Sequence, residues 1–365
     1  MSSRFRLPAY CPPAFDQAPL REAPVVRSEP APGDGILPDG FHATTNLPEY
    51  VKVSPDEWIL LEESRMDAVI ILGNQGPQAV EPRLVRKGDR VVIGRGENGE
   101  EGIYVHTDGF GAASSNFDKW SFHGRRTRES PYSRDYDSLY ELLRWEREND
   151  GYIVWVLGPA VAFDKDSREA TSSLIEAGYC QAIMAGNALA THDLEAALYG
   201  TGLGQGVYDQ RRQERGHYHH LDAINRARRF PTIREGVAGM GVTDGIVAAC
   251  VARGVPMVLA GSIRDDGPLP EVIADSYESQ QEMRVHARRA TTAIAVATQL
   301  HAIAFGNMLP SYQVRGELVR PVYFYIVDIS EFALDKLANR GSMQVTGITT
   351  NAQDFMVNLG RALAP

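Results

Sequence analysis

The chain has 365 residues, of which 43% are hydrophobic, enough to bury cores in two domains. Its 37 Lys and Arg against 47 Asp and Glu give a formal net charge of −10. Without a basic block, nucleic acid and anionic membrane surfaces are excluded as expected partners. No apolar stretch predicts a signal peptide or a membrane span, so we expect a cytoplasmic protein with a small-molecule partner.

Residues 1–40 are rich in proline and predict an extended arm on the body or on a neighbouring subunit. Residues 41–130 predict a β-rich domain, because short apolar alternations are broken by glycine. A helix is expected over residues 136–149, capped by Ser133 or Asp135.

Residues 131–365 predict the catalytic domain. From Gly151, apolar strands alternate with helical patterns, which is typical of βαβ units and a parallel sheet. The stretch 271–305 predicts one long helix, charged in its first half and apolar in its second. Such a helix must be buried by the sheet or by another subunit, and we therefore expect at least a dimer.

The segment VPMVLAGSIRDDGPLP, residues 255–270, predicts a buried strand that stops in a polar turn. In an open parallel sheet, ligands bind at such carboxyl ends of strands. Asp265 and Asp266, beside Arg264, could bind an amine or move its protons. A solvated loop that caps the next helix is the alternative.

Two further turns, Gly186-Asn187-Ala188 and Gly306-Asn307-Met308, follow apolar elements, and each could bring backbone N–H groups to a ligand or be a plain tight turn. The acidic helix start after the first turn provides second-choice acid–base candidates, although acidic residues there also suit the helix dipole. They are His192, Asp193 and Glu195.

Asp328 ends the apolar run VYFYIV, where a carboxylate can accept hydrogen bonds from an adenine ribose or can cap the next helix. GTGLGQG, residues 200–206, follows a helical pattern and predicts a flexible loop, not a dinucleotide fingerprint. Lys336 is expected to be an exposed helical lysine.

No metal site is expected. The run HYHH, residues 217–220, lacks carboxylate or cysteine partners at ligand spacing nearby in the sequence, and this favours a solvated or hydrogen-bonding histidine cluster. The three cysteines, Cys11, Cys180 and Cys250, form no C-x-x-C pair and predict neither a disulfide framework nor a zinc site.

From about residue 40 to residue 363 the chain resembles the family named for a lysine-oxoglutarate reductase/saccharopine dehydrogenase region, which includes NAD-dependent ornithine cyclodeaminases. The resemblance rests on long strings: FHATTNLPEYV (41–51), AGNALATHDLE (185–195), HLDAIN (220–225), residues 255–270, HAIAFGNMLP (301–310) and 328–350. It implies an α/β fold, with the β-rich domain followed by a Rossmann-like, deoxyhypusine-synthase-type domain that holds NAD without the glycine fingerprint.

The resemblance also implies the cofactor contacts, which are Asn187, Ala188, Asp266, Asn307, Met308, Leu309, Asp328, Asn351 and Ala352. The family usually has aspartate where this chain has Asn351. The implied reaction converts ornithine to proline and ammonia by removing and returning one hydride.

Charge and position suggest roles in that reaction. We expect Asp265 or Asp266 to hold or deprotonate the amine, with His192, Asp193 and Glu195 as second choice and Arg264 on the substrate carboxylate. Glu195 is also a candidate substrate contact. Three alternatives stay open: an opine-type or other amino-acid dehydrogenase, a cyclodeaminase of another diamino acid, and a non-enzymatic NAD-binding sensor. A homo-oligomer, either a dimer or a tetramer, is expected.

Overall fold

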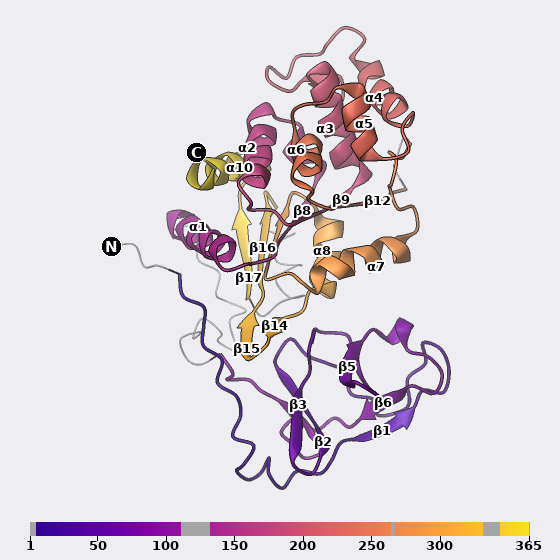
Figure 1. The fold of residues 1–365 in the computed structure, drawn as a ribbon, viewed down its shortest axis with the longest axis vertical. Helices are drawn as coiled ribbons and strands as arrows, with labels where there is room; N and C mark the ends of the chain where they lie inside the picture. Colours follow the sequence, from indigo (N-terminus) through magenta and orange to yellow (C-terminus); the bar gives the residue numbers. More distant parts are fainter. Residues whose placement is uncertain (1–4, 111–131, 264–266, 331–343, 365) are drawn as a thin grey trace.

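The computed structural model describes residues 5–110, 132–263, 267–330 and 344–364. A small N-terminal part built from antiparallel strands lies at one end of a larger α/β domain (Figure 1). In the described residues, no helix is long and apolar enough to cross a membrane.

The N-terminal part contains two sheets, ordered β1-β6-β4-β5 and β3-β2-β7. Their strands are β1 (Arg27–Pro30), β2 (Glu49–Ser54), β3 (Glu57–Leu60), β4 (Val69–Gly73), β5 (Gly76–Val80), β6 (Arg90–Ile93) and β7 (Ile103–Val105). Buried aliphatic side chains such as Val51, Ile70 and Val92 form the core between them. The expected β-rich domain is therefore present.

The proline-rich segment is only partly an arm. Its residues 27–30 pair with β6 as strand β1, so the β-rich part begins before residue 41. Upstream of β1, Phe5 and Leu7 pack against the core of the α/β domain. The segment also lies against the β-rich part, where the Lys52 ammonium donates hydrogen bonds to the Arg21 and Ala23 carbonyls. It therefore joins the two parts by lying across both.

The α/β domain is built on six parallel strands in the order β12-β9-β8-β13-β16-β17. They are β8 (Ile153–Leu157), β9 (Ala182–Gly186), β12 (Met257–Ala260), β13 (Thr292–Val296), β16 (Tyr323–Asp328) and β17 (Gln344–Thr349). Strand β8, the first of these six along the chain, is central; β9 and β12 extend the sheet to one side, and β13, β16 and β17 extend it to the other. The order of strands therefore reverses between β8 and β13, where doubly wound sheets bind nucleotides.

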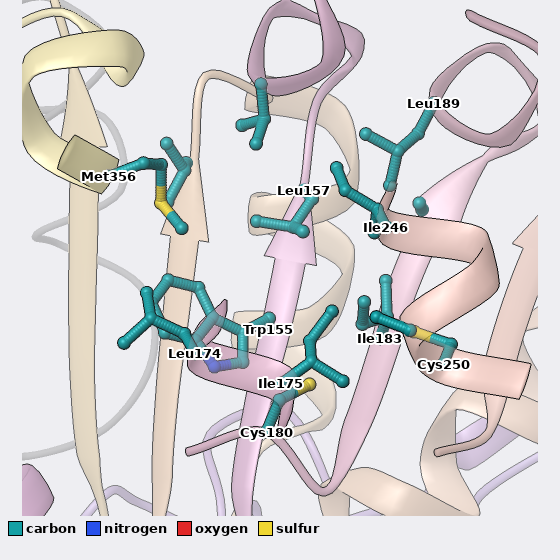
Figure 2. Close-up of a cluster of buried hydrophobic side chains, with 14 of the residues drawn as sticks. Trp155, Leu157, Leu174, Ile175, Cys180, Ile183, Leu189, Ile246, Cys250 and Met356 are labelled. Atoms are coloured by element: carbon teal, nitrogen blue, oxygen red, sulfur yellow. The ribbon is translucent and has the colours of Figure 1, made fainter. Parts of the chain in front are cut away.

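Helices cover both faces of this sheet (Figure 1). One face packs on α1 (Tyr132–Glu148), α2 (Lys165–Glu176), α3 (Asn187–Tyr199), α5 (Ile233–Met240), α6 (Ile246–Arg253) and α10 (Ala352–Leu363). The other packs on α7 (Ser276–Ala287) and α8 (Gln299–Met308). Figure 2 shows Trp155 and Ile183 of the sheet beneath Leu174, Ile246 and Met356 of the helices, with Cys180 and Cys250 in the same apolar layer. The two cysteines are thus core residues.

The prediction of a single helix over residues 271–305 is wrong. This stretch contains α7, strand β13 and most of α8. Its run of small and β-branched residues, 291–296, is buried on both faces of the sheet, and such a strand shows the same unbroken apolarity as a buried helix. Most of the apolar half is therefore covered within the chain, although Leu300 of α8 is exposed, and a buried apolar helix no longer supports the expectation of a dimer.

The β-rich part docks at the edge of the sheet where the strands begin. Ser311 links the two parts, because its N–H donates to the Ser64 carbonyl while its carbonyl accepts from Val322, the residue before β16. Arg284 of α7 forms a buried ion pair with Glu81 of the β-rich part. Among the described residues, the contacts of the β-rich part named here all lie away from the opposite, carboxyl edge of the sheet.

Candidate cofactor and substrate site

The two strands at the reversal point end in close backbone contact. Gly158, which follows β8, donates its N–H to the Val296 carbonyl at 2.9 Å. A Cβ atom placed on Gly158 would lie 2.0 Å from the Ala297 carbonyl oxygen, so only glycine fits here. Ala297 itself has a left-handed backbone with φ 51°. The end of β8 and the end of β13 are thus held together at the base of the candidate site.

Asn187 follows β9 as the first residue of α3 and is buried, so the expected turn is a strand-to-helix junction. Its side-chain oxygen accepts a hydrogen bond from the Leu269 N–H at 3.0 Å. Gly186 caps α3 without a side-chain hydrogen bond to the helix, and Ala188 is half-buried in its first turn. Helix N-terminal N–H groups at a strand end favour an anionic group such as a phosphate.

His301 lies over the end of β9 and was not among the expected site residues. It stands in the first turn of α8, directly after β13, and a Cβ on Gly186 would come within 3.2 Å of its Cε1. Burial lowers the pKa of His301 below its ordinary value of 6.5, so the imidazole is neutral at physiological pH. A neutral imidazole at this edge can accept a proton. The histidine was part of the family motif 301–310, but nothing in its spacing marked it as a site residue.

Asp328 is the last residue of β16, at the same carboxyl edge. One carboxylate oxygen accepts the Ser330 N–H at 2.9 Å, which is the local turn expected of a capping aspartate. Its carbonyl accepts the Thr350 N–H from the end of β17. The position of Asp328 therefore fits both predicted roles, that of a helix cap and that of a ribose contact.

Asn351 and Ala352, both implied cofactor contacts, stand at the start of α10 at the same edge. Asn351 is the N-cap, and its side-chain oxygen accepts the Asp354 N–H at 2.7 Å. Its amide nitrogen donates to the Asp354 carboxylate. The Asn351 side chain thus serves the helix start.

The end of β12 completes the edge. At the start of the loop that follows β12, Gly261 donates its N–H to the Ile273 carbonyl. At the far side of the loop, the Asn187 side chain is hydrogen-bonded to Gly267 and Leu269. Both ends of the loop between residues 261 and 267 are therefore fixed near the end of β9. Arg264, Asp265 and Asp266 lie within that loop, outside the described residues. Lys336, Ser133 and Asp135 also lie outside the side chains that the structure describes.

Asn307, Met308 and Leu309 do not lie with the other expected cofactor contacts. They occupy the end of α8, which carries the chain back to the edge where β16 begins, and Met308 and Leu309 are buried. The expected turn is the last turn of a helix. Within one chain these three residues lie at the edge of the sheet opposite Asp328.

Asp193 is buried in a structural network. Its Oδ1 atom accepts hydrogen bonds from Arg168 at 2.6 Å and from the Ile246 N–H. Its Oδ2 atom accepts a hydrogen bond from the Val247 N–H. These bonds hold α2, α3 and the start of α6 together, and the acid–base role expected of Asp193 stays a prediction.

His192 and Glu195 form a second buried group with His220 of α4 (His219–Ala227). His192 and His220 each place Nδ1 3.4 Å from Glu195 Oε2. Burial acts to raise the pKa of Glu195, but hydrogen bonds from His192, His220, Gly204 and Thr201 outweigh it and hold that pKa well below its usual range. Glu195 is therefore a buried carboxylate anion.

An open parallel sheet with this strand order, and with a helix N-terminus at the end of the strand next to the reversal point, defines a Rossmann-fold nucleotide-binding protein. Residues 138–359 match the family described as "Arginine dihydrolase ArgZ-like, C-terminal, Rossmann fold". The ornithine cyclodeaminase of Methanopyrus kandleri is 40% identical over 93% of this chain and 78% of that protein.

Solved structures agree with these matches. A conserved LOR/SDH protein from Methanococcus maripaludis has 36% identity and a TM-score of 0.82, covering 93% of this chain and 98% of that one. The ternary complex of AgrE with ornithine and NAD⁺ has 31% identity and a TM-score of 0.58, covering 94% of this chain and 46% of that one; a curated AgrE comes from a Nostoc species. The chain therefore belongs to the family of the ornithine cyclodeaminases and of the C-terminal Rossmann part of ArgZ-like proteins.

Proposed function

We propose that this protein is an NAD-dependent ornithine cyclodeaminase, which converts L-ornithine to L-proline and ammonia. The observation that carries the proposal is the carboxyl edge of the parallel sheet, where α3, His301 and Asp328 surround the reversal point between β8 and β13. The relatives named ornithine cyclodeaminase, and AgrE with its bound ornithine and NAD⁺, support the same activity.

The residues at this edge fit a dinucleotide. The start of α3, capped by Gly186 without a side-chain bond to the helix, offers N–H groups for a phosphate. Asp328, on the far side of the reversal point, would accept hydrogen bonds from a ribose diol. NAD⁺ held here would supply reversible hydride transfer, in which the amine-bearing carbon of the substrate loses a hydride and the cyclic imine regains it as proline, so that no cofactor is consumed.

The chain must then manage protons and exclude water. His301, neutral and largely buried above Gly186, is placed to take the proton of the reacting ammonium group. We assign Asp265 or Asp266 to holding that amine and Arg264 to the substrate carboxylate, because the described ends of their loop are fixed beside Asn187. A closed site would protect the reactive imine from hydrolysis.

Incubation of the protein with L-ornithine and NAD⁺ tests the proposal. Proline and ammonia should appear in equal amounts without accumulation of NADH. Accumulating NADH would support the alternative of an amino-acid dehydrogenase. Parallel reactions with shorter and longer diamino acids test which diamino acid is the substrate. If NAD⁺ binds but no diamino acid reacts, the result would support the alternative of a non-enzymatic NAD-binding sensor.

A further inference from the structure

A second cluster of chemically active side chains lies further along α3 from the strand edge. His192 and Glu195 stand three residues apart on α3, and His220 approaches from the first turn of α4. Each residue offers one ligand atom, and the three atoms lie within 4.8 Å of one another. Folding thus supplies the carboxylate partner that the run HYHH lacks in its own stretch of sequence.

The hydrogen bonds from the two imidazoles to Glu195 are long, and their length is close to the separation of two ligands on one metal ion. Both imidazole nitrogens lie 3.4 Å from Glu195 Oε2. A charge-assisted hydrogen bond would bring nitrogen and oxygen to about 2.7–2.9 Å. Two ligands about 2.0–2.1 Å from a tetrahedral zinc ion are separated by roughly 3.3–3.4 Å. The two nitrogen-to-oxygen separations therefore match an edge of a zinc coordination tetrahedron, and the two histidine ligand atoms lie within 4.8 Å of each other.

Surrounding groups hold the carboxylate in one orientation. Glu195 Oε1 accepts hydrogen bonds from the Thr201 hydroxyl and the Gly204 N–H, both at 2.9 Å, and Oε2 accepts the Leu203 N–H at 3.0 Å. The Thr201 hydroxyl is also within 2.9 Å of His219 Nδ1. Outer hydrogen bonds of this kind fix the ligands of natural metal sites.

The histidine rings are fixed as well. Phe163 packs edge-on against His192 with ring centroids 4.7 Å apart, and the His192 and His220 rings lie 4.8 Å apart. The side chains of Glu195 and His192 are 0% and 7% exposed, whereas that of His220 is 15% exposed. The site is therefore mostly dry and opens toward solvent on the His220 side.

We propose that His192, Glu195 and His220 bind one Zn²⁺ ion through their Nδ1, Oε2 and Nδ1 atoms. Two imidazoles with one carboxylate favour Zn²⁺ over Mg²⁺ or Ca²⁺, which prefer oxygen ligands. Three protein ligands leave the fourth position for water.

The ion would join α3 to α4 across the glycine-rich connection of residues 200–218. That connection contains only the two-residue strands β10 (Thr201–Gly202) and β11 (Gln205–Gly206) and the turn η5 (Gly216–Tyr218), and residues 208–215 are all exposed. So little buried apolar surface gives the connection little stability of its own, and a metal that closes the loop would add to it.

The test measures zinc on the full chain. Protein stripped with a chelator is titrated with ZnCl₂ by calorimetry, and its zinc content is measured after dialysis. We expect one zinc per chain and a higher melting temperature with zinc. His220→Gln should weaken binding at least about 100-fold, since loss of an outer-shell partner alone costs about 10–100-fold. His217→Gln is the matched control, because His217 is exposed in the same run and outside the cluster.

Glu195→Gln provides a second variant that keeps the shape of the ligand. Circular dichroism without zinc shows whether each variant folds. A stripped protein that takes up no zinc, or equal zinc affinity of the His220→Gln and His217→Gln proteins, would overturn the proposal. None of these measurements uses ornithine or NAD⁺, so their outcome is independent of the proposed enzymatic function.

Discussion

The guanidinium of Arg168 lies 2.6 Å from the carboxylate of Asp193, measured from Nε to Oδ1, and both side chains are buried. Arg168 also reaches Asp244 at 3.0 Å, just before α6. The pair thus ties α2 to α3 and to the start of α6 inside the α/β domain. Removing one partner of such a buried pair leaves an uncompensated charge.

Asp193→Asn should therefore lower the free energy of unfolding by about 3–5 kcal/mol. Urea denaturation followed by circular dichroism measures the loss. Lys165→Ala on α2, the helix of Arg168, is the control, because the exposed Lys165–Glu169 pair is worth about 0–1 kcal/mol. A variant of Asp193 that is as stable as the parent protein but inactive would instead support its acid–base role.

His301→Gln should reduce kcat about 10²- to 10⁴-fold if His301 is the general base. Because the base acts when neutral and burial lowers the pKa of His301, the parent enzyme should keep its activity below pH 6.5 and lose it only as the pH falls through that lowered pKa. A pH profile of kcat measures the position of this acidic limb. His217→Gln is the exposed control, and a His301→Gln enzyme with parental kcat and profile would exclude the role.

His286 predicts a pH dependence of stability. Its Nδ1 lies 2.7 Å from the Tyr152 hydroxyl, and burial, followed by the charge of Arg289, lowers its pKa below 6.5. Since the unfolded chain then binds the proton more readily, the stabilising contribution is complete above pH 6.5 and is lost as the pH falls through the folded-state pKa.

Melting temperatures measured between pH 8 and pH 5 check this prediction. His286→Gln should show a shallower decline on the acidic side than the parent protein. An unchanged slope would mean that the proton taken up on unfolding belongs to another group.

Asp328→Ala should weaken NAD⁺ binding about tenfold, which corresponds to about 1.4 kcal/mol, and should reduce the preference for NAD⁺ over NADP⁺ because the carboxylate no longer repels a 2′-phosphate. Fluorescence titration with both cofactors measures the two affinities. Asp222→Ala, on the exposed face of α4, is the control. Equal cofactor affinities in the Asp328→Ala and control proteins would place the ribose elsewhere.

Much of the α/β domain could be predicted from local patterns. Strands β8, β9, β12 and β16 were expected because each is a short apolar run that ends in small or polar residues. Strand β13 was mistaken for helix because burial on both faces removes the alternation that distinguishes a strand. The order of the strands, which creates the site, depends on pairings between distant segments and has no local signal.

The candidate site was predictable only in part, for the same reason. Asn187 and Asp328 were found because they follow strands directly. His301 was missed because its neighbour Gly186 is far away in the sequence. The contact of Glu195 with His220 could not be predicted either, since Glu195 comes from the preceding helix α3, 25 residues away in the sequence.

The central position of β8 has a consequence for synthesis of the chain. Its neighbour β13 is made more than a hundred residues later, which takes on the order of ten seconds at about 5–20 residues per second. Until then one hydrogen-bonding edge of β8 has no partner strand on the ribosome, and unpaired edges invite association with other chains. Productive folding in the cell therefore depends on shielding that nascent edge, and fast expression should favour aggregation.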